Sequence, residues 1–271
     1  MAGFLPFAGK NSVVEAALGL QFVQPLSPLI GPSFDALQRE FIADFPKFEK
    51  LQMLQFNLGV AQPAEAHTAM VGGFNATRVR GDGNPSRAFR GANNVISLHF
   101  FEYSHWNETK AIGLGLFVRC LKLLGIPSAQ NPIVAITLKF VDRFTFDGPA
   151  DMASASQLLK QETRYVSKEI FDVQIPWHVN TGWSEPLLGE KIGQHQLLVQ
   201  GAKDLNSFIM VQHNISFSVL PFLTVVEETD GRKEPLLEEI FDAQHQSNVL
   251  LLKNMLTDEM CGAIGLGGEG S

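Results

Sequence analysis

The chain has 271 residues, of which 21 are basic and 28 acidic, and its formal net charge is −7. Its apolar fraction of 45% can fill the core of one large domain or two modest lobes, which excludes an intrinsically disordered chain. The negative charge gives no general attraction to a phosphate backbone, so we expect no general nucleic-acid binding.

The predicted secondary structure follows an order that runs twice along the chain. The first run begins with a strand at residues 13–23 and a helix at 33–50. Alternating polar and apolar residues continue from there to residue 89, and a strand at 94–103 and a helix at 109–124 follow. The second run begins with a strand at residues 133–146 and a helix at 153–170. Three strands follow at 173–180, 196–200 and 208–222, and a helix at 235–260 ends the run. We therefore predict an α+β fold of two pseudo-repeated modules, each an antiparallel sheet covered on one face by helices.

The two predicted modules span residues 1–128 and 129–262, and a glycine-rich tail, predicted to be flexible, occupies residues 263–271. Two prolines, Pro127 and Pro132, bound a short hinge between them. Because the hinge is so short, we expect the two sheets to lie edge to edge or face to face in one compact unit.

Side-chain alternation in residues 133–146 predicts a long strand with one covered face. Leu138 and Phe140 are expected to face the core, and Lys139, Asp142 and Arg143 to face outward. The alternation slips at Phe140 and its neighbour, which predicts a β-bulge at this point.

Three further features of the predicted helices are informative. Gly113 and Gly115 lower the stability of the helix at 109–124, which suggests close packing of that helix against the sheet. The last helix carries His245 on its apolar stripe, where a hydrogen-bonded core histidine is expected. A second capped turn is predicted at residues 257–262.

The cysteines and the hydropathy pattern favour a cytoplasmic location. Cys120 and Cys261 are far apart and lie among apolar neighbours, as expected for buried free thiols in a reducing compartment. No stretch reads as a secretion signal or as a membrane-spanning helix.

The sequence carries no motif for catalysis. It has no nucleophile elbow, no phosphate-binding loop and no dinucleotide fingerprint in a suitable context. His99, Glu102 and His105 are closely spaced, but on a strand they cannot converge on one metal ion. The other histidines considered lack thiols or carboxylates at metal-ligand spacing, namely His178, His195, His213 and His245. We therefore predict no catalytic residue, no metal and no cofactor, which favours a binding role and leaves an enzyme as the rival interpretation.

Two groups of polar residues are candidate binding sites. The first is a pocket in which His99, Glu102 and Arg143 would hold a small molecule or nucleotide, with hydrolysis as one use of such a pocket. The second is a set of arginines around the turn at residues 81–85, which would contact an anion or an acidic partner, namely Arg78, Arg80, Arg87 and Arg90. A solvated hairpin tip is the alternative for the second group.

A protein partner is predicted from an excess of apolar residues at two places. The arm at residues 3–7 contains Phe4 and Phe7, and residues 221–226 extend a strand past the expected edge of its sheet. If both were exposed, they would form a patch that monomers seldom leave bare. The expected partner is a second copy or the product of a neighbouring gene, and docking of the arm on its own sheet is the alternative.

Three motifs in this order resemble a sporadically distributed bacterial family that has no established activity. The N-terminal motif is carried by Asn11, Val13, Val14, Glu15, Leu18 and Phe22. The central motif is the run Leu138, Lys139, Phe140, Val141, Asp142 and Arg143. The C-terminal motif consists of Phe241, Asp242, His245, Leu256, Thr257, Asp258 and Glu259.

The resemblance covers nearly the whole chain and departs from the family in the middle strands. Where the family carries Trp and Tyr around an Arg, this chain has Phe74, Arg78 and Phe89. Proteins that carry these motifs look like accessory products of mobile or defence-related bacterial loci. The resemblance therefore implies a non-catalytic, protein-binding or regulatory component, and a small-molecule or nucleotide pocket is the alternative function.

Overall fold

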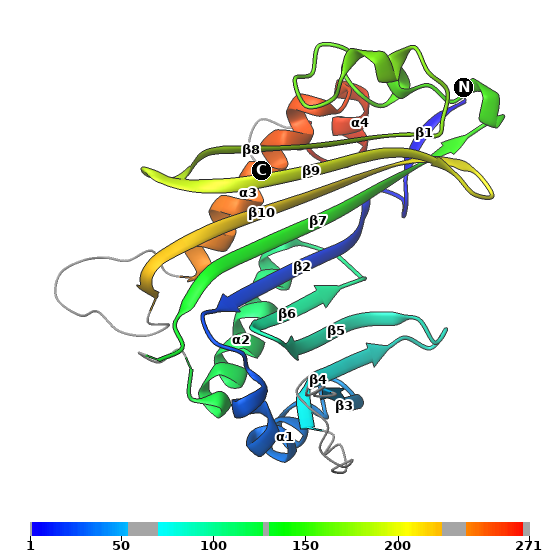
Figure 1. Cartoon of the computed structure of the whole chain (residues 1–271). Coiled ribbons are helices and arrows are strands. Elements are labelled where there is room, and N and C mark those ends of the chain that lie inside the picture. Colours follow the sequence, from blue (N-terminus) through cyan, green and yellow to red (C-terminus); the bar gives the residue numbers. More distant parts are fainter. Residues whose placement is uncertain (1, 54–69, 127–129, 224–236, 268–271) are drawn as a thin grey trace, which may run out of the picture.

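The described residues form one ten-stranded antiparallel sheet with helices packed on it (Figure 1). The computed structural model describes residues 2–53, 70–126, 130–223 and 237–267. The strands are β1 (Gly3–Pro6), β2 (Val13–Phe22), β3 (Lys47–Met53), β4 (Met70–Val79), β5 (Pro85–Ala92), β6 (Val95–Phe100), β7 (Ile133–Asp147), β8 (Trp177–Leu188), β9 (Lys191–Lys203) and β10 (Ser207–Leu223). Their order is β3-β4-β5-β6-β2-β7-β10-β9-β8, and β1 pairs with β7.

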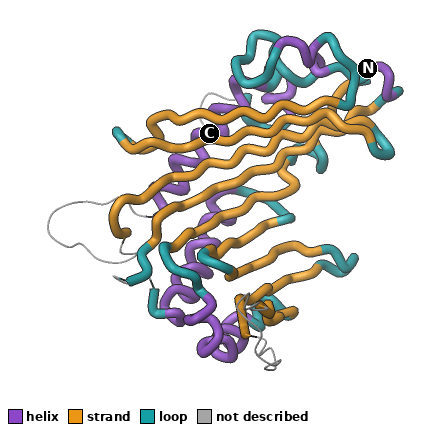
Figure 2. The backbone as a smooth tube through the Cα atoms, viewed as in Figure 1, coloured by secondary structure: helices purple, strands orange, loops and turns teal. Residues whose placement is uncertain are grey.

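The helices cover one face of this sheet. They are α1 (Ser27–Phe41), α2 (Trp106–Leu124), α3 (Leu237–Met255) and α4 (Asp258–Ala263), with three short 3-10 turns at Ala150–Met152, Ala155–Gln157 and Lys168–Phe171. Figures 1 and 2 show α2 and α3 behind the strands, so we call that side the helix face. Helix α1 shares a hydrophobic core with α2 and the first-half strands. The opposite side is the open face, which carries Ser97, Thr137, Lys139, Gln196 and Asn214.

The central strand, β7, joins the two halves of the chain in one sheet. It pairs with β2 on one side and with β10 on the other, and β1 also pairs with its end. The α+β class, with helices on an antiparallel sheet, is confirmed. The strands of the two halves meet edge to edge at the β2–β7 pair, and this single sheet gives no evidence of two repeated modules. The predicted module boundary, at residues 127–129, lies outside the described residues.

The bulge predicted in β7 lies instead in β2. The register of β7 against β10 is unbroken from Thr145 to Ala135. The irregularity falls between Val13 and Glu15 of β2, opposite Asp142 and its neighbour. Asp142 is buried on the helix face, and the adjacent Val141 is buried on the open face. The alternation of polar and apolar residues is therefore interrupted here, although the pairing register of β7 is regular.

Residues 153–170 do not form the predicted helix. They contain two of the short 3-10 turns, and Ser154 forms a capping box with Gln157 around the second turn. Serine side chains that bond to nearby backbone compete with helix formation. The apolar residues of this segment instead fill a core with β7, β9, β10 and α3, through Ala153, Ala155, Leu158, Leu159, Tyr165, Val166 and Ile170.

Other boundaries also differ from the predictions. Helix α1 begins at Ser27 and ends at Phe41, and β3 replaces the last part of the helix predicted at 33–50. In β3 the side chain of Phe48 is buried while Lys47 and Glu49 are exposed, which is strand periodicity. The strand predicted at 173–180 begins only at Trp177.

Several local predictions are confirmed. The turn at 81–85 joins β4 to β5, and α2 ends at Gly125, whose φ of 64° is the left-handed conformation that glycine favours. Thr257 accepts a hydrogen bond from the backbone N–H of Met260 and begins α4. Cys120 and Cys261 are both buried free thiols. Within the described ranges, no helix has the length and hydropathy needed to cross a membrane.

Candidate functional site

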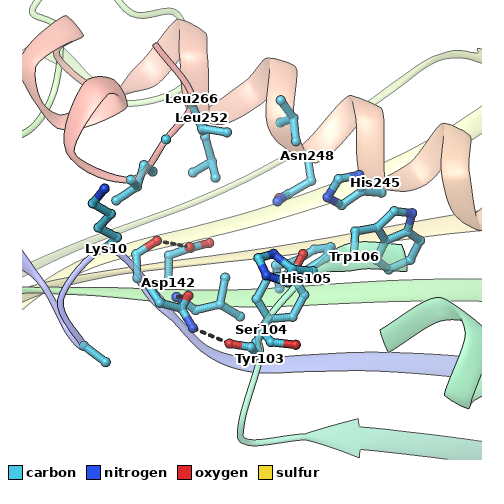
Figure 3. A pocket seen from close by; sticks show the side chains of 18 residues that line it. Lys10, Tyr103, Ser104, His105, Trp106, Asp142, His245, Asn248, Leu252 and Leu266 are labelled. Atoms are coloured by element: carbon cyan, nitrogen blue, oxygen red, sulfur yellow. Dashed lines mark hydrogen bonds between the residues drawn. The ribbon is translucent and has the colours of Figure 1, made fainter. Parts of the chain in front are cut away.

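The main candidate site is a cavity of about 530 Å³ between the sheet and α3 (Figure 3). Its walls come from the start of β2, the β6–α2 connection, β7, α3 and the segment after α4. The residues that line the cavity include Ser12, Tyr103, Trp106, Phe140, Asp142, His245, Asn248, Val249, Leu252, Ile264 and Leu266. Apolar and aromatic residues make up more than half of the whole lining, and the rest is polar and includes Lys10, Asn11, Ser104 and His105. Apolar walls with placed polar groups are typical of a small-molecule pocket.

The carboxyl group of Asp142 is the most unusual group in the cavity wall. Its side chain lies on the helix face of β7 and is only 1% exposed. Oδ1 accepts a hydrogen bond of 2.7 Å from the Ser12 hydroxyl, and no described residue donates to Oδ2. Burial raises the pKa of Asp142 to about 6, although the bond from Ser12 opposes this shift. The prediction that Asp142 faces outward is therefore wrong.

An aromatic stack forms another part of the cavity wall. The rings of His245 and Trp106 are parallel, with centroids 4.5 Å apart. The indole N–H of Trp106 donates to Asp242, which also binds Lys110 at 2.7 Å. Burial lowers the pKa of His245 to about 4, although the nearby Asp242 carboxylate opposes this shift, so the imidazole is neutral at pH 7. His245 is partly buried and stacked, and is not the hydrogen-bonded core histidine that was predicted.

Asn248 connects the cavity to a pair of buried histidines. His213 Nδ1 lies 3.0 Å from Asn248 Oδ1, and His195 Nδ1 lies 3.1 Å from His213 Nε2. Burial lowers the pKa of His213 to about 4, against the opposing effect of the Asn248 hydrogen bond. Trp183 stacks on both imidazole rings.

The direction of these hydrogen bonds follows from the amide. Because Asn248 Oδ1 can only accept, His213 Nδ1 carries the proton, and the neutral ring then accepts at Nε2 from His195. The amide Nδ2 of Asn248 has no acceptor among the described side chains. Asn248 therefore offers the cavity a hydrogen-bond donor, while Asp142 offers an acceptor.

A second hollow, of about 500 Å³, lies on the open face around Lys139 and His99. Glu15 accepts from His99 Nδ1 at 2.7 Å and from Lys139 Nζ at 2.8 Å. Burial of Glu15 opposes its ionisation, yet the hydrogen bonds from His99 and Lys139 lower its pKa to about 2. Both oxygens of the Glu15 carboxylate are therefore already hydrogen-bonded to neighbouring side chains.

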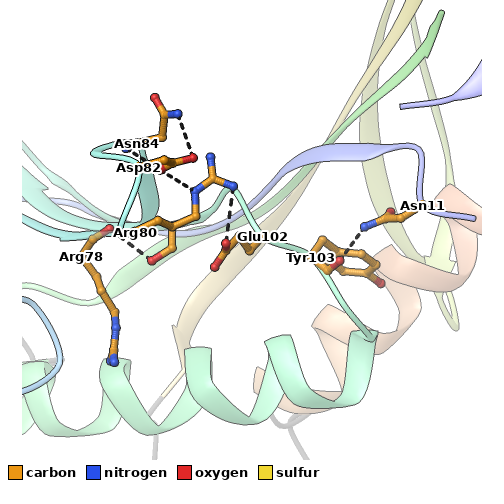
Figure 4. Close-up of polar contacts among 8 residues, drawn as sticks. Asn11, Arg78, Arg80, Asp82, Asn84, Glu102 and Tyr103 are labelled. Carbon is orange, nitrogen blue, oxygen red and sulfur yellow. Dashed lines mark hydrogen bonds and ion pairs between the residues drawn. The ribbon is translucent and has the colours of Figure 1, made fainter. Parts of the chain in front are cut away.

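The three residues of the predicted ligand pocket have different partners. His99 contacts Glu15 on the open face, and Glu102 forms an exposed ion pair of 3.4 Å with Arg80 (Figure 4). The guanidinium of Arg143 lies 4.1 Å from the centroid of the Phe208 ring. No contact joins any two of the three within the described chain, so the structure does not bring them together.

The four predicted arginines do not form one patch. Arg78 and Arg87 are directly paired across β4 and β5. Arg90 is three residues from Arg87, so its side chain points to the other face, where it donates to Asn75 at 2.9 Å. Arg80 forms ion pairs with Asp82 and Glu102 (Figure 4).

The N-terminal arm is part of the sheet. As β1 it pairs with β7 from Gly3 opposite Asp147 to Pro6 opposite Phe144. Phe4 is 5% exposed and packs against Phe146, whereas Phe7 is 55% exposed. Docking of the arm on its own sheet, the alternative to a partner surface, is what the structure shows for Phe4. Residues 224–226 of the second apolar segment lie outside the described residues.

Comparisons with models of protein families, with curated proteins and with solved structures found no match to this chain. The candidate site therefore rests on its geometry alone. Sequence reasoning did not single out Asp142 or Asn248 as site residues. For Asp142 a usable pattern was present, because it keeps the two-residue spacing of Leu138 and Phe140 and therefore shares their buried face.

Proposed function

We propose that the cavity beneath α3 binds a small molecule that carries a hydrogen-bond donor for Asp142 and an acceptor for Asn248. The observation that supports this most directly is the Asp142 carboxyl group, which is buried at 1% exposure with one oxygen bonded only by Ser12. A buried carboxylate is costly unless hydrogen bonds or an opposite charge compensate it. A ligand N–H group would supply that compensation.

The rest of the cavity favours a compact, largely apolar body for this ligand. Phe140, Val249 and Leu252 form apolar walls, and the Trp106–His245 stack presents aromatic surface. The volume of about 530 Å³ lies within the range of small-molecule pockets. Aromatic amides and nitrogen heterocycles combine a planar body with adjacent donor and acceptor groups, so they are the class we favour.

A thermal-shift screen of the purified chain tests this proposal. Benzamide, nicotinamide and adenine carry both a donor and an acceptor, and benzylamine carries a donor only. A compound that binds only the folded state raises the melting temperature. We expect members of the first group to raise it, and we expect the shift to be lost in Asp142→Asn and in Asn248→Leu.

Glu102→Gln is the matched control, because it removes a carboxylate that is exposed and outside the cavity wall. Its ligand-induced shift should equal that of the unmodified chain. If no compound of the class shifts the melting temperature, or if Asp142→Asn responds like the control, the proposal is wrong.

This function is the pocket alternative of the sequence analysis, built from different residues. The cavity contains neither His99, Glu102 nor Arg143. The protein-binding or regulatory role in a bacterial locus, suggested by the family resemblance, stays a prediction. It is compatible with a ligand cavity, because binding in a wall formed partly by Ile264 and Leu266 would link the ligand to the segment that follows α4.

A further inference from the structure

We propose that β8 pairs antiparallel with β8 of a second copy of this chain, so that the two sheets become continuous across a two-fold axis. This interface is separate from the cavity beneath α3. The inference rests on the chemistry of the strand edge, on its lack of protection, and on the fit of the strand to itself.

Among the residues that the structure describes, strand β8 is one of the two edges of the sheet and pairs only with β9. Its outward backbone groups have no hydrogen-bond partner in the described part of the chain. Gly182, which has backbone atoms only, is exposed. A row of free N–H and C=O groups is completed by another extended chain, so the occupant of this edge is a strand.

The nearest loop does not fill the space beside this edge. Tyr165 packs against the Trp183 ring, with centroids 5.3 Å apart, on the helix face. A cavity of about 370 Å³ remains between this loop and the strand, lined by Arg164, Tyr165, Thr181, Trp183, Ser184 and Glu185. The loop therefore leaves space beside Thr181, Trp183 and Ser184 of the edge strand.

The two edges of the sheet differ in how they resist pairing. The opposite edge, β3, is short and carries the charged side chains of Lys47, Glu49 and Lys50, which discourage edge-to-edge association. In β8 the only Asp, Glu, Lys or Arg is Glu185. The register irregularity after Pro186 disturbs only the last residues of the strand. Residues 177–184 of β8 therefore carry no charged side chain that would discourage pairing.

The sequence of this stretch is compatible with pairing to itself. Residues opposite each other in an antiparallel pair share a face, and the midpoint of residues 177–185 is Thr181. A dyad at Thr181 places Val179 of each copy opposite Trp183 of the other on the helix face. On the open face it places Asn180 opposite Gly182. On the helix face it also places Thr181 opposite its own copy and Trp177 opposite Glu185. No like charges face each other.

Light scattering after size-exclusion chromatography tests the interface on the full chain. We expect twice the chain mass of 29.8 kDa at high concentration. Asn180→Lys places a cation on the exposed edge and should give a monomer. Gln196→Lys adds the same charge to the same open face on the inner strand β9 and should remain dimeric. A monomer at all concentrations, or a dimer that Asn180→Lys leaves intact, overturns the proposal.

Disulfide trapping tests the register and does not depend on how Asn180→Lys folds. Thr181→Cys lies on the dyad, where opposite Cβ atoms are about 5 Å apart, and should form a covalent dimer on mild oxidation. His178→Cys, which faces Ser184 of the other copy, should not. Cys120 and Cys261 are buried and do not interfere. Equal trapping of both variants, or trapping of neither, contradicts the proposed pairing.

Discussion

His213 Nδ1 donates a hydrogen bond of 3.0 Å to Asn248 Oδ1 and so ties the middle of β10 to α3 inside the core. Both side chains are almost fully buried, at 1% and 4% exposure. A donor that loses its partner in such a place cannot turn to water. The pair therefore contributes to stability mainly through the cost of separating it.

Asn248→Leu should lower the free energy of unfolding by about 2 kcal/mol, because it leaves the buried His213 N–H without an acceptor. The measurement is urea denaturation at pH 8, where both buried histidines are neutral. In a His213→Phe background the same substitution should cost less, since the unpaired donor is then absent. Equal costs in the two backgrounds would show that the hydrogen bond is unimportant.

Asp142→Asn should change how stability depends on pH. The pKa of Asp142 rises on folding from 3.8 to about 6, so its protonation stabilises the fold as pH falls through this window. The pKa values of His213 and His245 fall on folding from 6.5 to about 4. The unfolded chain therefore binds protons first, and the two histidines lower the stability of the fold as pH falls through the same range. Removing Asp142 should therefore steepen the loss of stability between pH 7 and pH 5, by about 1 kcal/mol.

The check is a set of urea denaturation curves from pH 5 to pH 8 for both proteins. Glu102→Gln serves as the control, because Glu102 is an exposed carboxylate. Parallel pH profiles for the unmodified chain and Asp142→Asn would contradict the burial of a titrating carboxyl group at this position.

The two glycines of α2 should respond differently to alanine. Around Gly115 there is open space, so Gly115→Ala should raise the free energy of unfolding by about 1 kcal/mol through helix propensity. At Gly113 a Cβ atom would lie 2.9 Å from Leu18 Cδ2, so Gly113→Ala should gain less or destabilise. Thermal denaturation of both variants measures this, and an equal gain would mean that α2 does not pack closely on β2.

The two aromatic residues of the N-terminal arm should also separate in stability measurements. Phe4→Ala removes a buried ring that packs on Phe146 and should cost about 3 kcal/mol. Phe7→Ala affects an exposed ring and should cost less than about 1 kcal/mol. Chemical denaturation distinguishes them, and similar costs would contradict the docking of β1 on β7.

Strong side-chain periodicity made part of the fold predictable. The alternation in β6, β7 and β10 and the apolar stripe of α2 and α3 identify these elements, with boundaries shifted by a few residues. Whether two halves share a sheet depends on the pairing of β2 with β7, which are far apart in the chain. Local patterns carry no information on such a pairing, so the sequence left edge-to-edge and face-to-face arrangements of the two halves both open.

The site was harder to predict than the elements. Asp142 is polar and was therefore assigned to the solvent side, although its spacing matched the buried residues before it. Its burial becomes understandable only once Ser12, from another strand, is seen to bond it. In residues 153–170, apolar spacing suggested a helix, but the segment folds over the sheet in short turns that its serines help to stabilise.

The central place of β7 also restricts how the chain can fold while it is being synthesised. Within the described part of the chain, the first strand, β1, has its only partner in the last residues of β7, around Asp147. More than half of the 271 residues must therefore leave the ribosome before β1 can pair. Contacts between such distant residues form slowly, and Phe4 is exposed to other chains in the interval. Among the strand pairs of the described sheet, β1 and β7 are joined by the longest stretch of chain, so β1 waits longer for its partner than any other strand does.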